Sequence, residues 1–287
     1  MIRLIALLRA MRLALVCGLV TGSLIATAAE PVRLEYRFHV GDRVDMEVRH
    51  RALTETTIGS TRQATETATD SRKIWQVVAV DDDGRTTLEQ SVDEVHMTSR
   101  TSDRGEIRWS SSDTDPPPPG YETVGQSLGV PLTRMVIDRA GRVIARHDLR
   151  PIPPVSTGDL VVVPLPDDPV AVGSTWTVPD EVVVEAPHAG RKSVRTRLRY
   201  QIEAIEDGLA TIAVDTTVLT PIDDPRLEAR LLERIWDGTI LFDIDRGRVH
   251  SRSTTTDRRV VGFEGPQSSI RYKASLEEQV VDRSPDE

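Results

Sequence analysis

The chain has 287 residues, 28% of them charged, and a formal net charge of −9. This length fits one large domain or two ordinary ones with a sizeable hydrophobic core. The acidic balance argues against nucleic acid as a partner. The only cysteine, Cys17, lies near the start, which excludes disulfides and thiolate metal sites from the rest of the chain.

Residues 1–29 have the pattern of a secretory signal peptide. A basic start precedes an apolar run from Leu13 to Ile25, and the small residues Ala26-Thr27-Ala28-Ala29 follow it. Met11 is an alternative start, and cleavage is expected after Ala28 or Ala29. The protein is therefore expected to be exported, to the periplasm or to the extracellular space.

The mature chain is expected to be more acidic than the full sequence. Loss of residues 1–28 removes three arginines and no acidic residue, so the net charge becomes 33 − 45 = −12. No later apolar run approaches the length of a membrane helix, so no transmembrane span is expected in the mature chain.

Alternating apolar residues mark the first predicted strands. Leu34 to Val40 alternate with polar neighbours, Gly41-Asp42 interrupt the pattern, and Val44 to Val48 resume it. This pattern indicates two strands around a turn or bulge. Ala52 to Asp70 is rich in Thr and Glu, with few large apolar residues. Solvated edge strands are the favoured interpretation of this stretch, and a mobile loop is the alternative.

Asp-Gly pairs between apolar runs predict hairpins, because glycine supplies the positive φ that the turn requires. Arg72 to Met97 is therefore expected to form a hairpin that turns at Asp83-Gly84. Thr98 to Gly120 is expected to form a surface loop, and Glu122 to Gly129 a short helix or turn. Arg134 to His147 is expected to form a further hairpin.

Residues 151–171 are rich in proline and are expected to link two halves of the chain, because proline removes a backbone donor. The second half repeats three landmarks of the first in the same order. The matched pairs are Val40-Gly41 with Val172-Gly173, the Asp83-Gly84 turn with the Asp207-Gly208 turn, and Val136 to Val143 with Phe242 to Val249. The landmarks keep the same order in both halves although the spacing between them differs, which suggests a duplicated β unit.

These patterns predict a mainly β protein of two related antiparallel units, with one or two short helices. Each unit would be a curved sheet, either half-barrel or sandwich-like. The units span residues 30–150 and 172–282, the linker spans 151–171, and residues 283–287 form a disordered tail. Arg226 to Trp236 fits a helix and a strand about equally well.

Ser127 is the one candidate nucleophile, because Gly125 to Gly129 matches the G-x-S-x-G pattern of serine hydrolases. That pattern needs a preceding strand and a following helix. Here a proline-rich loop precedes it and Val130-Pro131 follow at once, so the context is missing. Residues that could complete a triad are His147, His188 and His250 as base, and Asp168 and Asp223 as orienting carboxylates.

No metal or cofactor site stands out. The six histidines are scattered without ligand spacing, and no cofactor is expected. Asp243 and Asp245 would project from one face of a strand and are the candidate cation ligands, although pairing with nearby arginines is the favoured interpretation. The four tryptophans, Trp75, Trp109, Trp176 and Trp236, are better explained as packed core than as a ligand platform.

The order of the landmarks is similar to that of uncharacterised secreted bacterial β-rich proteins with duplicated units. The similarity covers Val40 to Val143 and Val172 to Val249. It implies export and a β fold, and it brings no catalytic residues. The long amphipathic strands also resemble, at the level of fold alone, the half-barrels of periplasmic lipoprotein and lipid carriers.

The leading functional expectation is a non-enzymatic secreted or periplasmic protein that holds an apolar ligand or docks an envelope protein. Repeated strands with one apolar face and the lack of a convincing catalytic set favour it. The alternative is a serine hydrolase that uses Ser127. A third hypothesis, an envelope scaffold, differs from the first in having no pocket.

Overall fold

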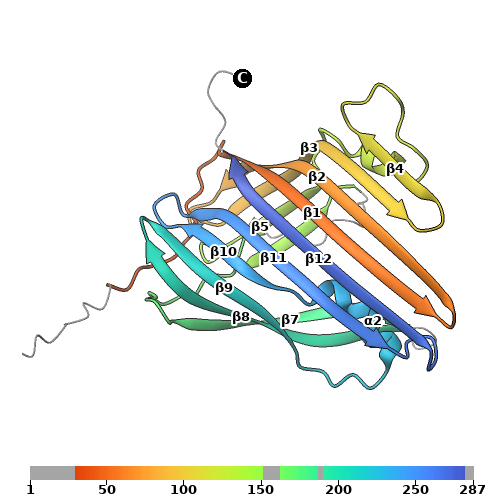
Figure 1. Ribbon diagram of the computed structural model, residues 1–287. Coiled ribbons are helices and arrows are strands. Elements are labelled where there is room, and N and C mark those ends of the chain that lie inside the picture. Colours follow the sequence, from red (N-terminus) through yellow and green to blue (C-terminus); the bar gives the residue numbers. More distant parts are fainter. Residues whose placement is uncertain (1–29, 151–161, 187–189, 282–287) are drawn as a thin grey trace, which may run out of the picture. The chain divides into compact units, whose positions relative to one another are not determined.

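Within residues 30–150, 162–186 and 190–281, which the computed structural model describes, the chain forms one curved, unclosed antiparallel sheet of twelve strands (Figure 1). The strands are β1 (Arg43–Ile58), β2 (Thr61–Val80), β3 (Thr86–Thr101), β4 (Gly105–Ser110), β5 (Thr133–Ile137), β6 (Val143–Asp148), β7 (Thr175–Ala186), β8 (Gly190–Glu206), β9 (Leu209–Val218), β10 (Asp237–Asp243), β11 (Arg248–Val261) and β12 (Ser268–Val281). The helical elements are α1 (Glu122–Gln126), α2 (Pro225–Leu231) and the 3-10 turn η1 (Leu232–Arg234). The prediction of a mainly β protein with one or two short helices is confirmed.

The sheet brings the first and last strands together in its centre. Its order is β6-β5-β3-β2-β1-β12-β11-β10-β9-β8-β7, and β4 pairs with β3. β1 pairs with β12 along its length, from Asp45 opposite Val281 to Ile58 opposite Ser268. β6 and β7, which are neighbours in sequence, therefore lie at opposite edges. Both predicted units contribute to one sheet, and the described residues from Pro31 onward belong to one compact unit.

The same hydrogen bonds recur at the first landmark of each half. The Gly41 N–H donates to the Val77 carbonyl at 3.0 Å, and the Val77 N–H donates to the Asp42 carbonyl at 2.8 Å. In the second half, Gly173 and Ile202 take the places of Gly41 and Val77, with distances of 2.8 and 2.9 Å. Both glycines have φ near +90°, a conformation that glycine adopts without steric cost. These repeated contacts support the interpretation of a duplicated unit.

The stretch from Leu34 to Phe38 is not a strand of the sheet, which corrects one sequence prediction. It is a segment that runs between the turn at Asp138–Gly141 and the turn at Asp243–Gly247. The Tyr36 N–H donates to the Arg139 carbonyl at 2.8 Å, and the Arg37 N–H donates to the Gly247 carbonyl at 3.0 Å. Its apolar side chains are buried in the main core. The alternation arises because one side of the segment faces the core and the other faces water.

The stretch from Ala52 to Asp70 forms interior strands, not the edge strands expected from its composition. β1 lies between β2 and β12, and β2 lies between β1 and β3. Threonine suits this position because its branched side chain packs well on a pleated surface. The composition indicates strands there but carries no information about which distant strand pairs with them.

The end of the proline-rich segment is buried in the core. Residues 151–161 lie outside the described residues, but Val162, Val163 and Leu165 are almost completely inaccessible to solvent. The Leu165 N–H donates to the Ala140 carbonyl at 2.7 Å. This part of the predicted linker therefore fills the inner side of the sheet, where its prolines need no strand partner.

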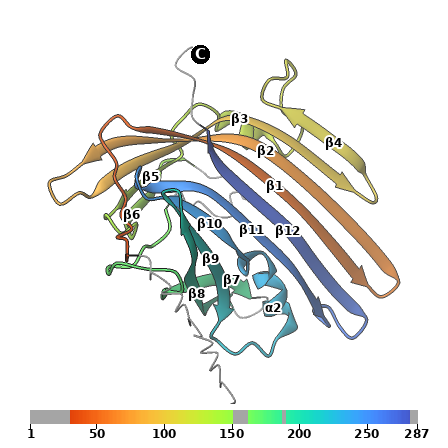
Figure 2. The same cartoon turned by 60° about the vertical axis from the view of Figure 1, so that its left-hand side comes forward.

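Helix α2 settles the alternative left open for residues 226–236 in favour of a helix. Asp224 caps it by accepting a hydrogen bond from the Arg226 N–H at 2.9 Å. Its residues Leu227 and Leu231 pack with Val184 and Val194 of β7 and β8. Figure 2 shows α2 on the inner side of the curve.

Among the described residues, no helix has both the length and the apolar character needed to cross a membrane.

Candidate functional site

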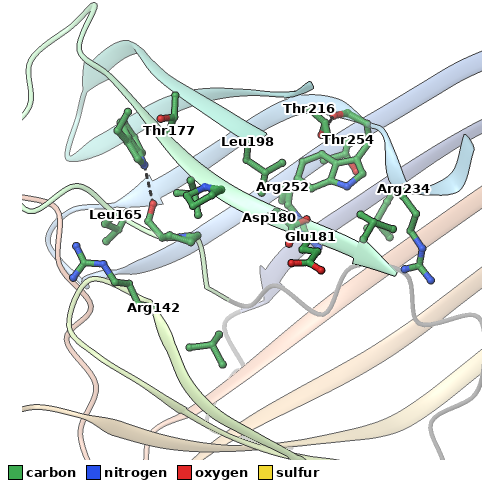
Figure 3. Close-up of a pocket in the computed structure, with 18 of the residues that line it drawn as sticks. Arg142, Leu165, Thr177, Asp180, Glu181, Leu198, Thr216, Arg234, Arg252 and Thr254 are labelled. Carbon is green, nitrogen blue, oxygen red and sulfur yellow. Dashed lines mark hydrogen bonds between the residues drawn. The ribbon is translucent and has the colours of Figure 1, made fainter. Parts of the chain in front are cut away.

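A cavity of about 1440 Å³ lies between edge strand β7 and the inner faces of β11 and β12 (Figure 3). The segment from Pro164 to Val170 bounds one part of it, and Glu233, Arg234 and Trp236, which follow α2, bound another. Its size exceeds the roughly 300–1,000 Å³ typical of small-molecule sites. The cavity can therefore accommodate a ligand larger than an ordinary metabolite.

Aromatic and aliphatic side chains form much of the cavity wall. The Trp176 ring stacks on Tyr200 with a centroid distance of 5.2 Å, and its indole N–H donates to the Pro164 carbonyl at 2.8 Å, the dashed line in Figure 3. Trp236, Leu198 and Leu276 also line the cavity. Two of the four tryptophans thus contribute to a cavity wall, whereas Trp75 and Trp109 are buried, in agreement with the packed-core interpretation.

A buried ion pair lies at the floor. Arg252 of β11 forms an ion pair with Glu278, its direct neighbour on β12, and both side chains are less than 5% exposed. The ammonium group of Lys73 on β2 lies 3.8 Å from the same carboxylate. Arg252 also lines the cavity. Charges this far from water are tolerated only when they are paired, so this cluster fixes the relative positions of three strands.

Uncharged polar groups lie beside this ion pair on the same inner face. His50 of β1 lies opposite Leu276, which lies opposite Thr254, and the next rung holds Ala274 and Thr256. All of these residues line the cavity. Within the described residues, His50 Nδ1 and Thr256 Oγ1 are buried and lack a hydrogen-bond partner. Burial, with Arg51 and Lys73 nearby, lowers the pKa of His50, so its imidazole is neutral at neutral pH.

Titratable groups at the cavity margin have ordinary structural partners. Burial, together with Glu233, raises the pKa of Tyr272 to about 12, so this phenol stays protonated. The Arg142 guanidinium lies 2.6 Å from Asp167 and lowers the pKa of that carboxyl. Neither group is prepared for proton transfer near neutral pH.

The structure does not place Ser127 on a nucleophile elbow. Ser127 follows α1 as its C-terminal cap, and its hydroxyl donates to the Thr123 carbonyl at 2.6 Å. The residue is only 6% exposed. Its hydroxyl therefore satisfies a helix end. Of the possible triad partners, His147, Asp168 and Asp223 are exposed at separate positions, His250 is half-buried on β11, and His188 lies outside the described residues.

The candidate cation ligands have local roles in a turn. Asp243 accepts a hydrogen bond from the Arg246 N–H at 2.8 Å and lies 3.8 Å from the Arg246 guanidinium. Asp245 is exposed beside Gly208 in the neighbouring hairpin. Across the described ranges, no group of three or more His, Cys, Asp or Glu side chains is placed to hold a metal ion.

The structure instead brings together a serine, a histidine and a carboxylate that sequence reasoning missed. Ser110 Oγ lies 2.8 Å from His96 Nδ1, and His96 Nε2 lies 3.0 Å from Glu94 Oε1. Glu94 and His96 are two apart on β3, and Ser110 is the cross-strand partner of His96 on β4. The Glu-x-His spacing is visible in the sequence, but the pairing with Ser110 is not. The His96 side chain is 49% exposed, so the group is solvated.

Together, these elements form a curved antiparallel sheet with a large, partly open cavity on its inner side. Comparison with known families finds no matching family model, and no curated protein matches either. Among solved structures, DynF from the dynemicin biosynthesis pathway of Micromonospora chersina aligns with 93% of this chain and 95% of its own. The two share 7% identity with a TM-score of 0.24, a similarity that carries no argument about function.

Proposed function

We propose that this protein is an exported, non-enzymatic binding protein that holds a largely apolar ligand on the inner side of its sheet. The observation that carries the proposal is the cavity of about 1440 Å³ lined by Trp176, Trp236, Leu198 and Leu276. Concave, mainly apolar sites with a few polar groups are the usual form of ligand sites. The signal-like residues 1–29 and the resemblance to secreted β-rich proteins support the export part of the proposal.

The size and lining of the cavity favour a lipid-like ligand over an envelope protein. A protein partner would need an accessible surface of roughly 800 Å², whereas these apolar side chains line a cavity between β7 and the central strands. Burial of apolar surface supplies about 25 cal/mol per Å², so a long apolar chain would gain most of its affinity from this wall.

Filling the cavity should abolish binding of an apolar fluorescent probe. Val178 lies on β7 and lines the cavity, so Val178→Trp places a large ring inside it. Titration with 1-N-phenylnaphthylamine should show saturable emission for the parent chain and at least a tenfold weaker response for the variant. Val261→Trp is the matched control, because Val261 is 64% exposed. Equal binding by all three chains would contradict the proposed site.

A second candidate function, hydrolysis, is favoured by the Ser110–His96–Glu94 contacts. In a hydrolase, His96 would take the serine proton and Glu94 would orient the ring. However, the Ser110 N–H donates to Asp113 at 2.8 Å, and the Ser112 N–H donates to Ser110 Oγ itself, so neither faces a substrate oxygen. We therefore expect the contacts among Ser110, His96 and Glu94 to have a structural role.

A fluorophosphonate probe distinguishes the two functions. We expect no labelling of the native chain above that of a heat-unfolded sample, because a solvated serine without an oxyanion site is a weak nucleophile. Labelling that disappears in Ser110→Ala and persists in Ser127→Ala would instead establish the hydrolase. If labelling is lost in Ser127→Ala but persists in Ser110→Ala, the nucleophile is Ser127, the serine of the G-x-S-x-G pattern.

A further inference from the structure

The cavity is amphipathic, and its polar part is rich in hydroxyl groups. The Thr216 hydroxyl at its margin donates to the Trp236 carbonyl at 2.8 Å, whereas Thr254 and Thr256 of β11 line the cavity together with His50 of β1. Figure 3 shows Thr216, Thr254, Arg252 and Leu198 in one part of the cavity and Leu165 at its other side. An apolar ligand without polar atoms would leave these hydroxyl groups poorly matched, which disfavours such a ligand.

Two of these side chains have an unmet hydrogen-bonding need. Among the described residues, His50 Nδ1 and Thr256 Oγ1 are buried without a partner. A buried polar atom that lacks a partner costs roughly 1–3 kcal/mol. Both residues line the cavity, so a change of side-chain rotamer would be needed to turn either atom toward its interior. A bound polar group would relieve both costs.

Leu276 and Ala274 of β12 lie between these two residues on the same face of the sheet. In the sheet register, Thr256 lies opposite Ala274, and Ala274 lies opposite Ala52, one rung from His50 on the same face. The Cα atoms of His50 and Thr256 are therefore separated by two strand spacings and one rung, or roughly 12 Å. A head group with at least two polar atoms can therefore offer one to each residue.

The chemistry of the two partners favours an uncharged head group. A neutral imidazole has one donor and one acceptor nitrogen, and a threonine hydroxyl both donates and accepts. A hydroxyl group on the ligand pairs with either nitrogen and with threonine, whatever the tautomer. A carboxylate only accepts, so it satisfies His50 Nδ1 only in the tautomer that carries the proton there.

We propose that the cavity takes an uncharged amphiphile with a hydroxylated head group, which hydrogen-bonds to His50 and Thr256 while its apolar chain contacts Trp176 and Trp236. This inference rests on the proposed binding function and names the class of its ligand. Acylglycerols are the simplest lipids with this chemistry. His50 and Thr256 are then the residues that determine specificity for the head group.

Two esters of the same acyl chain test the head group directly. Competition with 1-N-phenylnaphthylamine on the full chain compares 1-monododecanoylglycerol, which has two free hydroxyls, with methyl dodecanoate, which has none. Two added hydrogen bonds should make the glycerol ester bind at least about tenfold more tightly. In the double variant His50→Phe, Thr256→Val, this ratio should fall below about threefold, with the affinity for methyl dodecanoate unchanged.

A control variant and three further outcomes complete the test. His147→Phe is the control, because His147 is exposed on β6 and should leave the ratio intact. Equal affinity of the parent chain for both esters would overturn the head-group inference and leave the binding function standing. Tighter binding of the free dodecanoate anion than of the glycerol ester would have the same consequence. If neither ester nor the probe binds the parent chain, the binding function itself fails. If the double variant does not fold, Thr256→Val alone should reduce the ratio at least threefold.

Discussion

Replacing Glu278 by alanine should lower the free energy of unfolding by about 3–5 kcal/mol. Glu278 is 4% exposed and forms an ion pair with Arg252, which is equally buried, and it also attracts Lys73. The variant removes the carboxylate that these two cations share and leaves both of them between β2 and β11. Because buried charges are poorly solvated, the loss of this shared partner destabilises both of them.

Asp257→Ala is the matched control for this prediction. Asp257 lies on β11 and forms two hydrogen bonds with Arg271 on β12, at 2.8 and 2.7 Å, but both side chains are more than 40% exposed. Exposed pairs contribute little because water screens them. Urea denaturation followed by circular dichroism should show a large fall in midpoint for Glu278→Ala and a small one for Asp257→Ala. Equal falls would contradict the role assigned to the buried cluster.

Replacing Gly141 by alanine should lower the free energy of unfolding by about 3 kcal/mol. Gly141 has a φ of +74°, which costs roughly 1–2 kcal/mol for any other residue. A Cβ atom at this position would lie 2.4 Å from the Tyr36 ring and 2.7 Å from the Val163 carbonyl oxygen. Forcing these neighbours apart adds roughly 1–3 kcal/mol. The variant would therefore loosen both segments that pack on the inner face.

Gly59→Ala separates backbone strain from this close packing. Gly59 has a φ of +58° in the turn between β1 and β2, and a Cβ atom added there would meet no other atom within 4 Å. Thermal unfolding of both variants should show a cost of about 1 kcal/mol for Gly59→Ala and a clearly larger one for Gly141→Ala. If the two costs agree, the contact of Gly141 with Tyr36 and Val163 contributes nothing to stability.

Local features of the fold could be predicted from the sequence because they depend on a few adjacent residues. The hairpins at Asp83-Gly84 and Asp207-Gly208 follow from glycine in the turn, and the structure has both. The pairing of β1 with β12 could not be predicted, because alternation gives the face of a strand but not its partner. For the same reason, the alternation from Leu34 to Phe38 wrongly predicts a strand of the sheet.

The candidate site was less predictable than the fold. Trp176 and Trp236 are far apart in the sequence, and nothing in either local pattern indicates that they share a cavity. His50 lies in a strand with charged neighbours, and its sequence context does not reveal the burial of Nδ1. The Ser110–His96 contact likewise depends on cross-strand pairing. Sites assembled from several strands require the register of the whole sheet.

Mass spectrometry of organic extracts from the full chain, produced in cells and purified without detergent, tests the proposed ligand site most directly. We expect an apolar molecule in about one-to-one amount with the protein, and its loss from Val178→Trp but not from Val261→Trp. An extract without any such molecule, from a folded chain that also fails to bind 1-N-phenylnaphthylamine, would contradict the proposal that this cavity is a ligand site.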